Sequence, residues 1–129
     1  MPTFINPDDA PKPTSAYAQG VLVSANARRL IISGQVGVRP DGTMCEGMRA
    51  QTEQVFANMR AVLRAAGMDV TDLVKIVTYC TRPEEIGVIR EVRAGFLGAH
   101  TPASTFLMVP ALANPSYLIE IEAEAVKDA

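Results

Sequence analysis

The sequence lacks the features that mark several common classes of protein. No apolar run approaches the roughly 20 residues that a membrane-spanning helix needs, and residues 1–4 do not resemble a signal peptide. Cys45 and Cys80 are isolated thiols without CxxC spacing, which predicts neither a zinc site nor a disulfide framework. We therefore expect a cytoplasmic protein that has no membrane partner and binds no metal ion.

Positive charge, aromatic rings and histidine are also scarce. The formal net charge is -2 and aromatic residues make up 5% of the chain. Proteins that bind nucleic acid usually present a basic surface and stack bases on aromatic rings, so the sequence predicts no nucleic-acid partner. The single histidine, His100, follows a predicted helix, where it fits a capping or surface role. No histidine-containing catalytic triad is apparent.

The composition of the chain is typical of a globular protein: of its 129 residues, 48% are hydrophobic and 20% are charged. A chain of this length can bury a sizeable core unaided, and we expect one domain over residues 1–129. Apolar periodicity and turn residues predict the order strand, strand, helix, strand, helix, strand, strand. The predicted ranges are 21–25, 29–38, 47–66, 74–80, 83–98, 106–109 and 116–126.

The last predicted strand alternates apolar and acidic residues. Its apolar side chains share one face of the strand, and its acidic side chains share the other. The apolar residues are Ile119, Ile121, Ala123 and Ala125, and the acidic residues are Glu120, Glu122 and Glu124. Taken alone, the acidic row fits a solvated face of the strand. The run 106–109 is apolar throughout, which predicts an interior strand next to the acidic one.

Right-handed crossovers place both predicted helices on one face of a mixed sheet. The other face is also partly apolar, and no remaining segment of the chain can cover it. We infer that other copies of the protein cover this face. Gly34 and Gly37 interrupt the strand 29–38, which indicates a bulge or a position where another group approaches the backbone closely.

Several short segments occur in an order and spacing typical of one family. They are Tyr-Ala-Gln-Gly at 17–20, Ile-Ser-Gly-Gln at 32–35, Ala-Ala-Gly at 65–67 with Asp-Leu-Val-Lys at 72–75, Pro-Ala-Ser-Thr at 102–105, and Ile-Glu-Ile-Glu-Ala at 119–123. In these segments the chain resembles the Rid family, also called YjgF or L-PSP endoribonuclease-like, over about residues 6–126. The resemblance implies an α+β, chorismate-mutase-like fold, a barrel-like homotrimer, and a pocket for a small-molecule ligand at each subunit interface, with no cofactor.

The best-studied branch of this family hydrolyses enamines and imines made from amino acids to ammonia and a 2-keto acid. By resemblance, Glu120 and Tyr17 are the expected catalytic residues, and Ser33 and Gly34 are expected to bind the substrate. A carboxylate can orient the water that adds to a C=N carbon and can help move protons to the departing amine. Two alternatives stay open: Tyr17 packs its ring at a subunit interface, and Gly34 only relieves a bend in its strand.

The chain departs from that branch at one position. Ser104, followed by Thr105, stands where the branch has an arginine that pairs with the substrate carboxylate. Hydroxyls can bind a substrate but cannot replace that charge, so the chain resembles an arginine-lacking branch with altered specificity. Arg90 and Arg93 lie on the second predicted helix, which we expect to pack on the outside, away from the interface. Cys80 either contributes to the pocket or is an inert buried thiol.

Three hypotheses about function remain. The favoured one is a deaminase-like hydrolase acting on small enamines or imines. The second is a non-catalytic trimer that binds a small molecule and has lost the chemistry, which the serine at position 104 motivates. The third is the endoribonuclease activity in one of the family's names, which the net charge of -2 disfavours.

Overall fold

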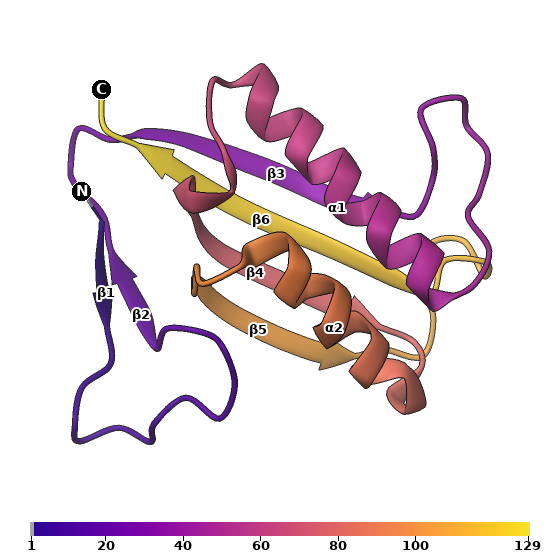
Figure 1. Cartoon of the computed structure of the whole chain (residues 1–129), viewed down its shortest axis with the longest axis horizontal. Coiled ribbons are helices and arrows are strands. Elements are labelled where there is room, and N and C mark those ends of the chain that lie inside the picture. Colours follow the sequence, from indigo (N-terminus) through magenta and orange to yellow (C-terminus); the bar gives the residue numbers. More distant parts are fainter. Residues whose placement is uncertain (1) are drawn as a thin grey trace.

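A computed structural model describes residues 2–129 of the chain. Its elements follow the predicted order, with one additional strand at the N-terminus and two short 3-10 turns (Figure 1). The strands are β1 (Thr3–Ile5), β2 (Gly20–Leu22), β3 (Arg28–Val36), β4 (Leu73–Cys80), β5 (Ala103–Met108) and β6 (Ile119–Lys127). The helices are α1 (Met48–Ala65) and α2 (Ile86–Leu97), and the 3-10 turns are Val70–Asp72 and Pro83–Glu85.

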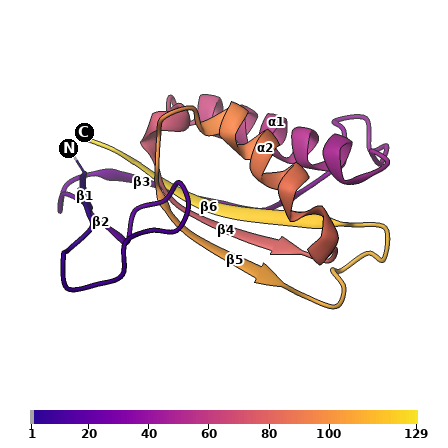
Figure 2. The same ribbon diagram turned by 60° about the horizontal axis from the view of Figure 1, so that its bottom comes forward.

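The main sheet has four strands in the order β3-β6-β4-β5. Strands β4 and β5 are parallel, as a connection through α2 requires, and β6 runs antiparallel to both β3 and β4. Both helices pack on the same face of this sheet (Figure 2). The predicted α+β architecture, a mixed sheet with two helices on one face, is therefore confirmed.

Two sequence-based expectations about the strands are wrong. The first predicted strand is the short β2, which pairs with β1 in a separate two-stranded sheet and does not join the main one. The last two strands are not neighbours, because the α2 crossover places β5 next to β4 and β6 lies between β4 and β3. Strand β5 is an edge strand, so its apolar run does not mark an interior position: Leu107 and Met108 are more than 40% exposed.

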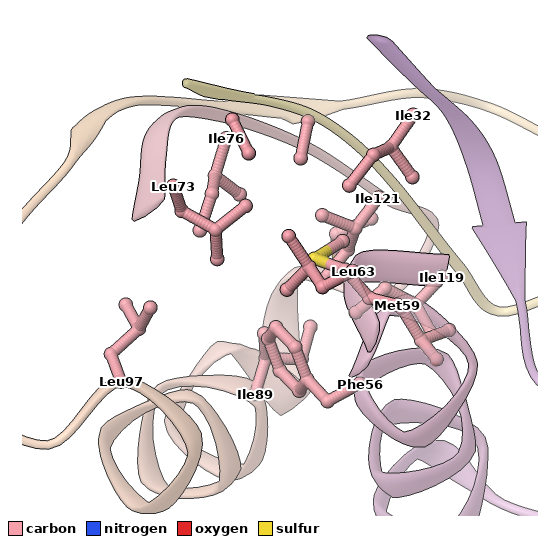
Figure 3. Close-up of a cluster of buried hydrophobic side chains, with 14 of the residues drawn as sticks. Ile32, Phe56, Met59, Leu63, Leu73, Ile76, Ile89, Leu97, Ile119 and Ile121 are labelled. Atoms are coloured by element: carbon pink, nitrogen blue, oxygen red, sulfur yellow. The ribbon is translucent and has the colours of Figure 1, made fainter. Parts of the chain in front are cut away.

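The core lies between the helices and the sheet. Val55, Phe56, Met59 and Leu63 recur along one side of α1 and are buried against the sheet. The apolar alternation of β6 is confirmed, since Ile119 and Ile121 are fully buried (Figure 3). The glutamates of β6 consequently project from the opposite face.

We call that opposite side of the main sheet the open face. Within residues 2–129 no helix packs on it (Figure 2). It displays Ile31 at 61% exposure and Leu107 at 43%, next to the acidic residues of β6. The prediction that the chain itself leaves this face uncovered is confirmed, and its coverage by other copies stays a prediction.

Candidate functional site

Most of the residues expected to form the site fall into two clusters in one copy of the chain. The first cluster, which we call the Glu120 cluster, consists of Ser33, Gly34 and Glu120 on the open face. Strand β3 has an irregularity between Ile32 and Gln35 where it pairs with β6, so Ser33 and Gly34 bulge out of the regular ladder. The predicted bulge is therefore present, and it lies beside Glu120.

Glu120 depends on the glycine at position 34 for its place. A Cβ atom at Gly34 would overlap the Glu120 side chain, lying 2.9 Å from its Cγ. A Cβ atom at Gly37 would meet a different obstacle, the backbone of α1, at 2.6 Å from Gln51 Cα. Both glycines thus permit the close approach that the sequence predicted, one to the candidate catalytic carboxylate and one to a helix.

The three glutamates on the open face of β6 differ in their partners. Glu124 forms an ion pair with Arg29 at 2.7 Å, and Glu122 accepts a hydrogen bond from the Tyr79 hydroxyl at 2.5 Å. That hydrogen bond, with the negative charges of Glu122 and Glu120 nearby, raises the pKa of Tyr79. Among the described residues Glu120 has neither a hydrogen bond nor an ion pair. It is therefore the carboxylate of this row that is available to a ligand.

The second cluster surrounds a hollow of about 230 Å³ beside β5, which we call the β5-edge hollow. The N-terminal loop reaches this edge because the Ala18 N–H donates to the Pro102 carbonyl at 3.1 Å and Ala18 forms a parallel bridge with Ala103. This contact brings Tyr17 beside Ser104. The lining residues are Thr14, Ser15, Tyr17, Arg90, Arg93, Ser104 and Phe106.

Two arginines of α2 line this hollow, and they differ in exposure. Arg90 is exposed at the hollow, but Arg93 is buried, with 7% of its surface accessible. Ile89, Arg93 and Leu97 are the buried positions of α2, each four residues from the next, so they share the face that packs on the sheet. This spacing is visible in the sequence, and an arginine at such a position is unusual because charged side chains are rarely buried.

Two further expected residues lie outside both clusters. Cys80 is fully buried among the core residues and its pKa is raised by that burial, which fits an inert thiol. Thr105 pairs in register with Val77, next to the register pair of Ser104 and Ile76, so Ser104 and Thr105 point to opposite faces. Ser104 faces the helices with Phe106, whereas Thr105 is exposed on the open face.

The two clusters of one copy cannot contact the same small molecule. Glu120 is level with Tyr79, whereas Ser104 is level with Ile76, three residues earlier in β4. Strands lie about 4.8 Å apart and rise about 3.3 Å per residue, so Glu120 and Ser104 are about 14 Å apart in the plane of the sheet. They also project from opposite faces.

Two other properties concern the described residues as a whole. Residues 2–129 contain no group of three or more His, Cys, Asp or Glu side chains arranged to hold a metal ion. None of the helices in this part of the chain is both long and apolar enough to cross a membrane.

The fold defines a small α+β protein that carries two clusters of polar side chains. Comparison with known proteins makes the class specific, because the profile of the family described as Endoribonuclease L-PSP matches residues 7–127. The chain belongs to this family, the Rid family.

Relatives and solved structures agree with this assignment. A RutC family protein of Pyrococcus horikoshii is 34% identical over 99% of this chain and 100% of its own length. The 2-iminobutanoate/2-iminopropanoate deaminase of Rattus norvegicus is 33% identical over 95% of this chain and 88% of its own. The crystal structure of the Rid family protein YyfB from Yersinia pestis superposes with a TM-score of 0.84 at 36% identity, covering 96% of this chain and 97% of that one.

Proposed function

We propose that this protein is a hydrolytic deaminase of small imines or enamines whose substrate specificity differs from that of its relatives. The similarity to proteins named 2-iminobutanoate/2-iminopropanoate deaminase, at 31% to 33% identity over nearly the whole chain, carries this proposal. The arrangement of Glu120 supports it, since this carboxylate has no partner among the described residues and rests against Gly34.

The reaction needs a water and proton transfers. Water adds to the C=N carbon to give a carbinolamine, which then releases ammonia and leaves a carbonyl compound. Glu120 is the proposed general base that accepts a proton from the attacking water and returns a proton to the departing nitrogen. Tyr17 is the proposed hydrogen-bonding partner of the substrate on the other side of the site. Every atom of the products comes from the imine and one water.

The proposed active unit is a homotrimer whose subunit interfaces bring the two clusters together. Glu120 and Ser104 of one copy lie about 14 Å apart in the sheet plane and on opposite faces, so one copy alone does not complete the site. The exposed apolar residues of the open face, Ile31 and Leu107, are suited to burial against a neighbouring copy. A neighbouring copy placed on the open face would bring its own β5-edge hollow, with Tyr17 and Ser104, next to Glu120.

A second candidate function is a trimer that binds a small molecule without converting it. Ser104 favours it, because the residue that holds the substrate carboxylate in the best-studied branch is missing from its usual position. Ligand binding without release of ammonia would establish this alternative. Ribonuclease activity is disfavoured by the net charge of -2 and would show itself as salt-dependent RNA binding.

The test is ammonia release from imines generated in situ, with carboxylate-bearing and neutral imines in one panel. Replacement of Glu120 by Gln keeps the size of the side chain and removes the base, so we expect turnover to fall about 100-fold or more. Glu122→Gln is the matched control, since it changes a glutamate on the same face of β6, and its turnover should stay within a few-fold of wild type. Equal activity in the Glu120 variant and the wild type would refute the assigned role.

A further inference from the structure

The β5-edge hollow is lined by a largely buried arginine, Arg93, whose guanidinium reaches the hollow and has no protein partner among the described residues. Arg93 takes a core position of α2, between Ile89 and Leu97, and is more than nine-tenths buried. An arginine normally occupies such a position only when a carboxylate, a set of carbonyl groups or a ligand compensates the cost of desolvating its charge.

Among residues 2–129, no side chain supplies that compensation. The ion pairs in this part of the chain join Arg29 to Glu124 and Arg49 to Glu91, and neither includes Arg93. No hydrogen bond of the Arg93 side chain is found there either. The charged group that acts on it is Arg90, of like sign, and burial together with this second cation lowers the pKa of Arg93. The two guanidinium groups therefore create a local excess of positive charge.

The other lining residues of the hollow are uncharged, and all of them except Phe106 carry a hydroxyl group. The hydroxyls of Tyr17 and Ser104 lie on the loop and strand that face α2, and Thr14 and Ser15 add two more. Each hydroxyl can donate one hydrogen bond to an anion. At about 230 Å³ the hollow is smaller than the sites that hold drug-sized ligands, so it suits a molecule of a few heavy atoms.

We propose that Arg93, with the hydroxyls of Ser104 and Tyr17, forms a binding subsite for the carboxylate of a small organic acid or of its imine. The planar guanidinium offers paired N–H donors that match the two oxygens of a carboxylate. Arg90 lies at the exposed rim of the hollow and attracts anions to it. This subsite deepens the proposed function: it rests on that function for the imine, and it makes carboxylate-bearing imines the substrate class.

The serine at position 104 then has a physical reason. Ser104 and Arg93 line the same hollow, so an arginine at position 104 would place a third guanidinium beside Arg93 and Arg90. Guanidinium groups that line one small hollow repel each other, and the repulsion is strongest where water is excluded. We therefore expect the hollow to accommodate one buried arginine, either from the helix or from the strand.

Binding of 2-oxobutanoate, measured by titration calorimetry, tests the subsite, with its uncharged methyl ester as the control ligand. We expect the acid to bind the wild type and to bind Arg93→Met about 10- to 100-fold more weakly, since one charge-assisted hydrogen-bonded pair is lost. The ester should bind both proteins equally. Arg64→Met is the matched control, because Arg64 is exposed on α1 and does not line the hollow, and its affinity should equal that of the wild type.

Two further variants separate charge recognition from a structural effect. Arg93→Lys keeps the charge and loses the paired donors, so its affinity should fall between those of the wild type and Arg93→Met. Adding Ser104→Arg to Arg93→Met should restore binding of the acid, because it returns one guanidinium to the hollow. Ser104→Arg in the wild-type background should not improve binding.

Three results would overturn the subsite: equal affinity of Arg93→Met and wild type for the acid, no binding of the acid by the wild type, or preferential binding of inorganic phosphate. Ammonia release separates this inference from the proposed function. Arg93-dependent binding without turnover would retain the subsite and refute the deaminase. Turnover of carboxylate-bearing imines with a KM unchanged in Arg93→Met would retain the deaminase and refute the subsite.

Discussion

Gly34 and Gly37 lie three residues apart on the same segment, and an added methyl group should have opposite consequences at the two positions. At Gly34 the new Cβ would meet the side chain of Glu120, which is partly exposed and can change its rotamer. A rotamer change costs about 0.5–1.5 kcal/mol. Alanine has less backbone entropy than glycine in the unfolded chain, which stabilises the folded state by about 0.4–1 kcal/mol. Gly34→Ala should therefore leave the free energy of unfolding nearly unchanged.

At Gly37 the obstacle is the backbone of α1. A Cβ there would lie 2.6 Å from Gln51 Cα, so the helix itself would have to move. The Gln51 side chain is buried. Its amide nitrogen donates hydrogen bonds to the carbonyls of Cys45 and Ser116, and its amide oxygen accepts one from the N–H of Leu118. Movement of the helix would strain these contacts. Overpacking of this kind costs about 1–3 kcal/mol. That corresponds to a fall in Tm of about 4–12 °C for a domain of this size.

Activity should respond in the reverse order. Gly34→Ala displaces the carboxylate that we assign as the general base, and a misplacement of about 1 Å at a reacting group can cost about 100-fold in rate. Gly37→Ala leaves Glu120 untouched, so the molecules that stay folded should keep their activity. Thermal melting and ammonia release, measured on both variants at a temperature where both are folded, test this pair. Full activity in Gly34→Ala would refute the placement of Glu120 in the site.

Two other predictions concern stability and assembly. Asp69 caps the 3-10 turn at Val70–Asp72 by accepting hydrogen bonds from Thr71, and these bonds lower the pKa of Asp69. Because Asp69→Ala removes this cap, the variant should have a Tm lower by a few degrees at neutral pH. Because the folded-state pKa is the lower one, this difference should be full above about pH 4 and disappear as the pH falls through the folded-state value. Ile31→Asp places a charge on the exposed apolar surface of the open face, which should weaken the contact between copies. Sedimentation should therefore show a trimer for the wild type and smaller species for the variant. A monomeric wild type at micromolar concentration would contradict the proposed assembly.

The parts of the fold that could be predicted from the sequence are those whose signal is local and periodic. The alternation in β6 fixes which of its side chains are buried, and that prediction holds residue by residue from Ile119 to Ala125. Gly34 in β3 and Gly37 just after it mark close approaches because glycine is the residue that leaves room for them. Strand order was not predictable in this way. The neighbours of β5 depend on the path of the α2 crossover, and the apolar run of an edge strand resembles that of a buried one.

The site shows the same division. Local motifs identified Tyr17, Ser104 and Glu120, but their distribution over two clusters on opposite faces follows from tertiary structure. Arg93 combines two local signals that disagree. Its four-residue spacing from Ile89 and Leu97 marks the buried face of α2, whereas arginine is a residue type that usually stays in water. At a functional site such a conflict between position and residue type is informative, because natural proteins break local rules mainly where function requires it.

The positions 93 and 104 therefore have to be interpreted together. If the missing arginine at 104 were a loss of function, the rest of the hollow would be free to become apolar, and a buried helix position facing it would favour leucine or methionine, which pack there without the cost of desolvating a charge. The chain instead keeps a guanidinium at position 93, a second at position 90, and hydroxyls at 17 and 104 around the same volume. A protein gains nothing in stability from an unpaired buried cation. The charge at position 93 supports our proposal that the hollow binds an anion and that the carboxylate is held from the helix, not from the strand.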